Sequence, residues 1–234
     1  MNGQSITWRN DKELFAIAKE KLFTALVGDV LDKMGFYRQF LPPHLKPLDP
    51  GMVVIGRAMP VVEADVFSEG TAVSQNPLLQ KPFGLMFEAL DDLKEDEVYI
   101  CSGASHRFAL WGGLMSTRAQ RLKAAGAVVN GFSRDTDEIL RLKFPTFAVG
   151  TYAQDQGPRG KVIDYRVPIE WEGVLIAPGD IVYGDRDGVI IVPQQIEEEA
   201  FRKAIEKATG EKHVLKALQS GMSAVDAFEK FGIM

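Results

Sequence analysis

The sequence predicts an α/β protein that forms one domain with a barrel-like β region. Three observations support this fold class. Apolar segments of strand length alternate with helical patterns between residues 98 and 149, as in a mixed α/β layer. Short strands joined by glycine-containing turns fill residues 162–192, which indicates β hairpins. No linker or internal repeat divides residues 1–234, so residues 194–234 are interpreted as a helical extension of the same domain.

Hydrophobic periodicity places the individual elements along the chain. Asn10 or Asp11 caps the first predicted helix, and Gly35 ends the second. Pro60 interrupts the valine-rich strand that follows, which predicts a strand that is bent or lies at a sheet edge. The predicted elements are, in order, helices 12–23 and 25–33, strand 52–66, loop 76–82, helix 83–90, strand 98–101, helix 114–125, strand 127–129, helix 136–142, strands 145–149, 162–171, 174–177, 181–183 and 189–192, helix 194–219 and a last helix capped by Ser223.

Composition excludes several classes of protein. The chain has 234 residues, of which 46% are hydrophobic, so a sizeable core forms without disulfides. A net charge of −5 without a basic tract argues against nucleic acid as the main partner. The single cysteine, Cys101, excludes an intrachain disulfide and fits a reducing compartment. The N-terminal residues carry no secretory signal and no apolar stretch approaches the roughly 20 residues of a membrane span, so we expect a cytoplasmic protein.

Common cofactor and hydrolase motifs are absent from the sequence. It contains no G-x-G-x-x-G after a strand, no phosphate-binding G-x-x-x-x-G-K-[ST], no H-E-x-x-H and no G-x-S-x-G. The sequence therefore gives no support for a dinucleotide, a nucleoside triphosphate, a histidine-bound zinc or a serine hydrolase.

The stretch from Gly112 to Glu138 carries the strongest functional signal. Gly112 and Gly113 precede a helix, where backbone N–H groups can face an anion. Arg134 and Asp135 follow a buried strand, at the position where open α/β sheets bind ligands. An arginine grips a carboxylate with two donors, and an aspartate offers a hard oxygen ligand to Mg²⁺ or Mn²⁺.

A purely structural interpretation of the same residues is also open. Asp135 and Glu138 have the spacing of a capping box for the helix beginning at Thr136. Arg134 can pair with a neighbouring acid, and close packing of backbone on backbone explains a Gly-Gly pair. Two further segments give weaker signals: His106 and Arg107 before the glycines, and the turn at 183–188, where hairpin chemistry accounts for the acids.

The motifs at 111–115 and 131–135 together resemble those of the RraA-like family. The segments 27–32 and 178–189 also fit this family, and the resemblance covers roughly residues 20 to 205. The family contains regulators of ribonuclease activity and class II 4-hydroxy-4-methyl-2-oxoglutarate aldolases. The resemblance implies a layered α/β/β domain of the swivelling-domain type. It also implies a homotrimer or a dimer of trimers with active sites between subunits.

The resemblance assigns roles to individual residues. It implies that Asp135 binds Mg²⁺ or Mn²⁺ and that Arg134 steadies the substrate and its enolate. Backbone amides after the glycines would receive the substrate carboxylate, which gives a substrate-binding set of Gly112, Gly113, Leu114, Met115 and Arg134.

One position departs from the aldolase pattern. Aldolases of this type typically carry, at the place of Gly113, an aspartate that holds a water for proton transfer. Here Glu138 is the acid that would take over this catalytic role. The resemblance also implies an acid from the neighbouring subunit, for which the candidates are Glu63, Asp185 and the acids of the C-terminal helix.

The leading hypothesis is a divalent-metal-dependent lyase that cleaves or decarboxylates a 2-oxo acid through a pyruvate enolate, as an aldolase or oxaloacetate decarboxylase. One alternative is a non-catalytic trimeric regulator that binds a protein such as a ribonuclease. Another alternative is a related metal-dependent sugar-acid lyase.

Overall fold

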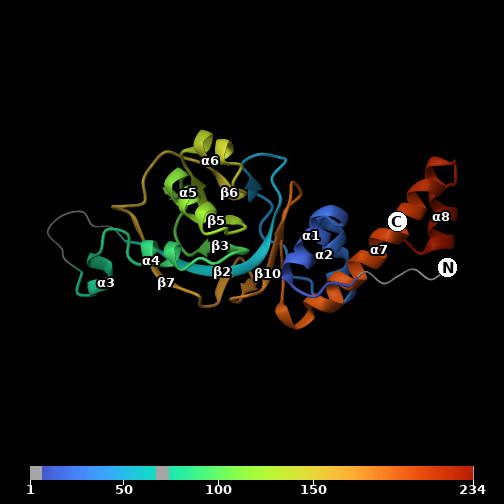
Figure 1. Cartoon of the computed structure of the whole chain (residues 1–234), viewed down its shortest axis with the longest axis horizontal. Helices are drawn as coiled ribbons and strands as arrows, with labels where there is room; N and C mark the ends of the chain where they lie inside the picture. Colours follow the sequence, from blue (N-terminus) through green and yellow to red (C-terminus); the bar gives the residue numbers. More distant parts are fainter. Residues whose placement is uncertain (1–6, 67–73, 234) are drawn as a thin grey trace. The chain divides into compact units, whose positions relative to one another are not determined.

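The protein is an α/β protein, as predicted, and its contacts divide it into two compact units. The computed structural model describes residues 7–66 and 74–233 (Figure 1). One unit joins the N-terminal residues up to Tyr37 to those from Gln195 onward, and the other is Arg38–Gln194. The interpretation of the whole chain as one domain stays a prediction.

A mixed sheet forms the centre of the larger unit. Strands β2, β3, β5 and β6 pair in parallel, β4 adds to β5 in parallel, and β1, β7, β10 and β11 pair antiparallel. The neighbour order is β1-β6-β5-β3-β2-β10-β11, with β7 also on β2 and with β8–β9 as a separate hairpin. The strands are β1 (Lys46–Pro47), β2 (Val54–Asp65), β3 (Glu97–Ser102), β4 (Ala109–Trp111), β5 (Gly126–Ser133), β6 (Thr146–Thr151), β7 (Gly160–Tyr165), β8 (Ile169–Trp171), β9 (Val174–Ile176), β10 (Ile181–Gly184) and β11 (Val189–Val192).

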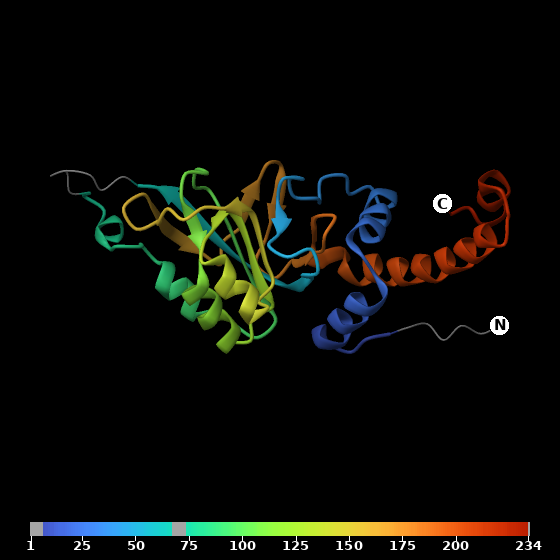
Figure 2. The ribbon, with the colours of Figure 1, turned by 90° about the horizontal axis from the view of Figure 1, so that it is seen from above.

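Alternating side chains give this sheet two buried faces. Tyr99 and Cys101 of β3 pack into the core under the helices, whereas Val98 and Ile100 pack into the opposite core with Trp171 of the β8–β9 hairpin. Figure 2 shows the helices within residues 86–142 on one side of the strands of this unit. The result is a helix layer, a central sheet and a second β layer. The helices of this unit are α3 (Pro77–Gln80), α4 (Met86–Asp91), α5 (Gly113–Arg121) and α6 (Thr136–Leu142).

Strand β2 shows how the β region curls. Its first residues pair with β10 and its last residues pair with β7, while its other edge pairs with β3 throughout Arg57 to Val62. Pro60 lies between the two partners, where the ladder does not require its missing N–H. Of the two predicted alternatives, a bent strand or an edge strand, the edge strand is therefore wrong, because a change of partner accommodates the proline inside the sheet.

Most predicted elements are confirmed, and four differ. The stretch predicted as one strand at 162–171 is two strands, because β7 joins the main sheet and β8 joins the hairpin. The predicted loop at 76–82 contains the single turn α3, and strands β1 and β4 were not predicted. Strand β4 has three residues, which is too short to show a periodic pattern.

The smaller unit consists of helices. Asn10 accepts a hydrogen bond from the Glu13 N–H and so caps the first helix as predicted. The long helix packs against the other helices through a face that includes Phe201 and Ile205. Leu215 is 54% exposed, whereas its neighbour Val214 is buried. The helices are α1 (Asp11–Lys21), α2 (Thr24–Lys33), α7 (Glu197–Gln219) and α8 (Ala224–Phe231), with the short helix η1 (Gln194–Ile196) before α7.

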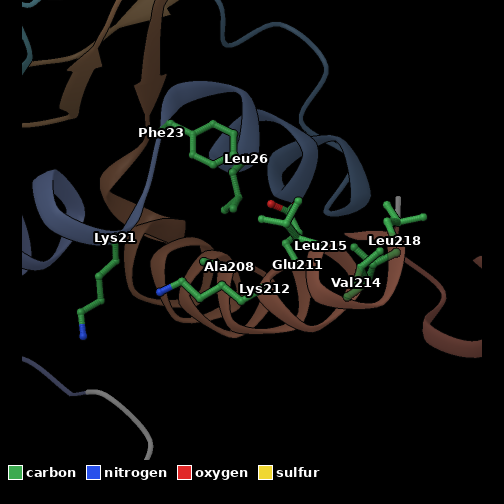
Figure 3. A pocket seen from close by; sticks show the side chains of 10 residues that line it. Lys21, Phe23, Leu26, Ala208, Glu211, Lys212, Val214, Leu215 and Leu218 are labelled. Atoms are coloured by element: carbon green, nitrogen blue, oxygen red, sulfur yellow. The ribbon is translucent and has the colours of Figure 1, made fainter. Parts of the chain in front are cut away.

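An apolar groove of about 400 Å³ lies between α2 and α7 in this unit (Figure 3). Phe23, Leu26 and Leu218 contribute to its walls, and Lys21 and Lys212 lie at its margin. No helix within residues 7–66 and 74–233 is both long and apolar enough to cross a membrane.

Candidate active site

Parallel pairing of β4 and β5 brings the two central motifs together. Trp111 pairs with Ser133 at the ends of these strands, and the Arg134 N–H donates to the Trp111 carbonyl oxygen over 2.9 Å. Gly112, which follows β4, and Arg134, which follows β5, therefore lie at the same edge of the sheet. The carboxyl ends of parallel strands are where such sheets place ligands. The predicted association of the two motifs is confirmed.

Asp135 adopts a backbone conformation that directs its side chain toward the glycines. Its φ is 56°, in the left-handed region, which costs about 1–2 kcal/mol for most residues and which aspartate tolerates better than others. Its Oδ2 accepts a hydrogen bond of 3.1 Å from the Gly113 N–H, and its side chain does not cap α6. The capping-box interpretation of Asp135 and Glu138 is therefore wrong. The carboxylate is held by the Gly113 amide and not by the first turn of α6.

Two acidic side chains crowd the Cβ positions of the glycines. Gly112 has a φ of −160°, which any residue adopts, and Gly113 is not left-handed either. A Cβ atom on Gly112 would lie 2.9 Å from the Asp135 Oδ2, and one on Gly113 would lie 2.2 Å from the Glu138 Oε2. The two carboxylates thus pack directly on the backbone at the start of α5. The Glu138 carboxylate takes the space that a side chain at position 113 would need.

Arg134 lies between two acids. Its Nη1 is 3.1 Å from the Asp155 Oδ1, and its Nε is 3.8 Å from the Asp135 Oδ2. All three side chains are partly exposed, and together they carry a formal charge of −1. Asp155 was not among the predicted site residues. Its place shortly after β6, the next parallel strand, was the signal that could have identified it, because this places it at the same sheet edge.

A cavity of about 300 Å³ opens beside these charged residues. Arg134 and Asp135 also border a second hollow with Tyr152 and Ala153. The cavity is lined by Phe83, Met86, Phe87, Leu90, Ala109, Leu110, Trp111, Gly112, Leu114, Met115, Arg134, Asp135, Asp155 and Gln156.

Five of the seven predicted site residues line this cavity, namely Gly112, Leu114, Met115, Arg134 and Asp135. The other two, Gly113 and Glu138, are not among the residues that line it, and the Gly113 N–H is already occupied by Asp135. The amide of Gly113 is thus not available to an anion, contrary to the expectation for that atom. The N–H groups of the first helical turn lack partners within a helix, which leaves those of Leu114 and Met115 as the remaining donors.

A buried carboxyl group lies behind Gln156. The Gln156 Nε2 donates to the Glu63 Oε2 over 2.7 Å, while the Glu63 Oε1 has no hydrogen-bond partner among the described residues. Burial raises the pKa of Glu63 to about 8, against a smaller opposite effect of the Gln156 hydrogen bond. Glu63 is 2% exposed and does not fit the role of an acid offered to a neighbouring subunit.

Replacing Glu63 by glutamine is expected to remove a pH-dependent loss of stability. A folded-state pKa of about 8, above the ordinary 4.5, means that the protonated carboxyl stabilises the fold at low pH. That stability is lost as the pH rises through 8. The Glu63→Gln variant should exceed the parent in unfolding free energy by at least about 1 kcal/mol at pH 8.5. The unfolding free energies of the variant and the parent should be closer at pH 5.

Urea unfolding at both pH values measures this difference in stability, with the exposed Glu198→Gln as control. A difference that is the same at both pH values would contradict the prediction.

The remaining candidate residues have structural partners. The His106 Nε2 is 2.7 Å from the Asn130 Oδ1, and Arg107 pairs with Asp65. Neither lines the cavity. In the turn after β10, the Asp185 Oδ1 accepts from the Asp187 N–H, as hairpin chemistry predicts.

The donor set around Asp135 fits a hard divalent cation that retains water. No group of three or more His, Cys, Asp or Glu side chains suited to a metal ion occurs within residues 7–66 and 74–233. Mg²⁺ needs no such cage, because one or two carboxylates, waters and substrate oxygens complete its shell. One oxygen of Asp135 is oriented by the Gly113 N–H, which fixes the carboxylate. The negative formal charge of the cluster also favours a cation.

Comparison with known proteins identifies one family over most of the chain. The family described as RraA-like, Aldolase/RraA, matches residues 24–191. A Halalkalibacterium halodurans protein, provisionally named a 4-hydroxy-4-methyl-2-oxoglutarate aldolase, is 30% identical over 88% of this chain and 89% of its own length. Protein DlpA of Legionella pneumophila is 28% identical over 89% of this chain, which spans only 32% of DlpA.

A solved structure has the same fold. Streptomyces coelicolor RraAS2, described as an unusual member of the RNase ES inhibitor RraA protein family, matches with a TM-score of 0.72 and 24% identity. The match covers 89% of this chain and 98% of that one. The predicted family resemblance is thereby confirmed in sequence and in fold.

Proposed function

The chain belongs to the RraA-like family, and from this premise we propose that it is a lyase that releases pyruvate from a 2-oxo acid with the help of Mg²⁺ or Mn²⁺. The observation that supports this most is the contact of Arg134, Asp135 and Asp155 at the mouth of a cavity. Aldolase names among the relatives agree with lyase chemistry.

Asp135 would hold the metal ion through the carboxylate oxygen that the Gly113 N–H does not engage. A divalent ion bound there supplies Lewis-acid polarisation of the keto and carboxylate oxygens of the substrate. Arg134, directed by Asp155, would place its guanidinium against the negative charge of the enolate. The free amides of Leu114 and Met115 would receive the substrate carboxylate at the start of α5.

Glu138 is the group we assign to proton transfer. Its Oε2 lies against the backbone of Gly113, at the place where a side chain of residue 113 would begin. From there it would hold a water molecule that delivers a proton to the enolate carbon. In oxaloacetate the bond between the methylene carbon and the distal carboxylate breaks, CO₂ leaves, and the methylene carbon gains one proton to give pyruvate.

The direct test is the release of pyruvate. Purified protein with Mg²⁺ should release pyruvate from oxaloacetate or from 4-hydroxy-4-methyl-2-oxoglutarate faster than heat-denatured protein with the same Mg²⁺. A chelator should abolish the difference, and Mn²⁺ should restore it. Release at the rate of the denatured control at every metal concentration would refute the lyase.

A second function is favoured by Gly113, which leaves the cavity without the acid that aldolases of this type carry there. In this reading the protein is a trimeric regulator that binds a protein such as a ribonuclease, and Leu114, 81% exposed, is a contact residue. Absence of pyruvate release together with co-purification of a ribonuclease would favour the regulator. We also propose that the protein forms a homotrimer or a dimer of trimers and is located in the cytoplasm. Sedimentation velocity would measure the mass of the assembly.

A further inference from the structure

A buried hydrogen bond joins the loop after β6 to strand β2. The β6–β7 loop, residues 152–159, carries Asp155, which pairs with Arg134 beside the cavity. The next residue, Gln156, is 2% exposed, and its Nε2 donates to the Glu63 Oε2 over 2.7 Å. Glu63 is not among the described residues that line the cavity, whereas Gln156 is. The loop that carries Asp155 is therefore held from inside the protein.

The backbone of this loop determines where the Asp155 carboxylate lies. Its Oδ1 is 3.1 Å from the Arg134 Nη1, and its Oδ2 accepts from the Gly157 N–H over 3.0 Å. The carbonyl oxygen of Gln156 accepts from the Arg159 N–H over 2.7 Å. Since Gln156 is bonded to Asp155, a shift of Gln156 would move the carboxylate that directs Arg134.

Glu63 is an unusual acceptor for such a contact, because its surroundings are apolar. Burial raises the pKa of the Tyr99 hydroxyl and of the Cys101 thiol, and the charge of Glu63 raises both further. Both residues belong to the core under the helices, so the Glu63 carboxyl lies near that core. Its Oε1 has no hydrogen-bond partner among the described residues. A carboxyl group in an apolar core costs stability, so its contribution is the acceptor that it offers to Gln156.

We propose that Glu63 is a positioning residue for the ligand site. By accepting from Gln156 it holds the β6–β7 loop, so that Asp155 directs Arg134 toward the cavity. The Arg134 and Asp155 side chains are 39% and 43% exposed, and an ion pair so exposed fixes little by itself. A loop held from the interior supplies the order that the ion pair lacks. This inference rests on the proposed function for the ligand that Arg134 receives.

Hydrogen exchange of the protein without metal tests whether Glu63 holds the loop. Glu63→Met keeps the size of the side chain and removes the acceptor, so exchange of residues 152–160 at pH 7 should become about five-fold faster or more. Glu63→Gln keeps an acceptor oxygen and should exchange there no faster than the parent. Gln156→Met removes the same hydrogen bond from its other end and should reproduce the effect of Glu63→Met, which covers the case in which Glu63→Met does not fold.

Glu97 provides the control for general loss of stability. It begins β3 and pairs with Arg166, and its side chain is 13% exposed. Glu97→Met should leave the exchange of residues 152–160 unchanged. Parent-like exchange of these residues in both Glu63→Met and Gln156→Met would overturn the proposal, and so would equally fast exchange in Glu97→Met.

Binding of oxalate, a dianion that resembles the pyruvate enolate, tests whether the loop acts on Arg134. Calorimetry with Mg²⁺ should show about ten-fold weaker binding or more for Glu63→Met, and nearly parental binding for Glu63→Gln. If Glu63 acts through Asp155, then Glu63→Met should add little to the loss caused by Asp155→Asn, because the two effects are not independent. Losses that simply add would overturn the proposal.

The outcomes separate this proposal from the lyase. If exchange and oxalate binding follow the expected pattern while no pyruvate is released from either substrate, the lyase is refuted and Glu63 remains a positioning residue. If pyruvate is released and Glu63→Met changes neither exchange nor oxalate binding, the lyase stands and the proposal is overturned. If the parent does not bind oxalate, the metal-assisted site is refuted, and the exchange pattern alone decides whether Glu63 holds the loop.

Discussion

Replacing Asp135 by asparagine is expected to reduce Mg²⁺-dependent pyruvate release by about a thousand-fold or more. Asparagine tolerates the left-handed backbone at φ 56°, and its amide oxygen can still accept from the Gly113 N–H. The substitution therefore removes the charge that would hold a cation and leaves the local geometry in place. Steady-state kinetics over a range of Mg²⁺ concentrations measures the effect. Asp135→Ala should be equally inactive while the oligomer remains intact.

Asp137 provides the matched control. It is exposed in the first turn of α6, two residues further along, and does not line the cavity. Asp137→Asn should retain the parent rate, because it removes a negative charge near the helix but leaves the carboxylate that would bind the metal ion. A parent-like rate in Asp135→Asn would show that the metal assignment is wrong, whatever the family relationship.

Introducing an aspartate at Gly113 is expected to destabilise the protein unless Glu138 is shortened as well. The new Cβ would lie 2.2 Å from the Glu138 Oε2 and 2.7 Å from its Cδ, so Glu138 must move. The end of the half-buried Glu138 side chain can swing aside at little cost, so the loss comes mainly from repulsion between the two carboxylates, about 1 kcal/mol. Urea unfolding should show this loss for Gly113→Asp. The loss should disappear in the double variant Gly113→Asp/Glu138→Ala.

Activity of the same variants tests the assigned role of Glu138. Glu138→Ala alone should lower kcat by about 10²–10⁴-fold, the range for loss of a positioned proton-transfer group. The double variant should recover part of this rate. Its aspartate at position 113 would place a carboxylate close to where the Glu138 carboxylate lies in the parent protein. If the Gly113→Asp single variant were stable and fully active, both the contact of position 113 with Glu138 and the assignment of proton transfer to Glu138 would be contradicted.

Local patterns in the sequence were sufficient to identify most elements and the two motifs that meet beside the cavity. Helix α6 begins at Thr136 and ends at Leu142, as predicted, and Asn10 caps α1. The Gly112–Gly113 and Arg134–Asp135 motifs were recognised from their positions before a helix and after a strand. These features depend on residues a few positions apart, so periodicity and turn chemistry report them directly.

Tertiary contacts decided what those residues do. Asp135 has the spacing of a helix cap, but the pairing of β4 with β5 brings Gly113 within hydrogen-bonding distance of its carboxylate. Asp155 joins the cluster because β6 lies beside β5 in the sheet. Glu63 is buried by packing that no local pattern records. The sequence by itself determined the elements and the two motifs, whereas strand pairing over long sequence separations determined which side chains meet. The reason is that such pairing depends on the whole sheet and is not encoded within any single segment.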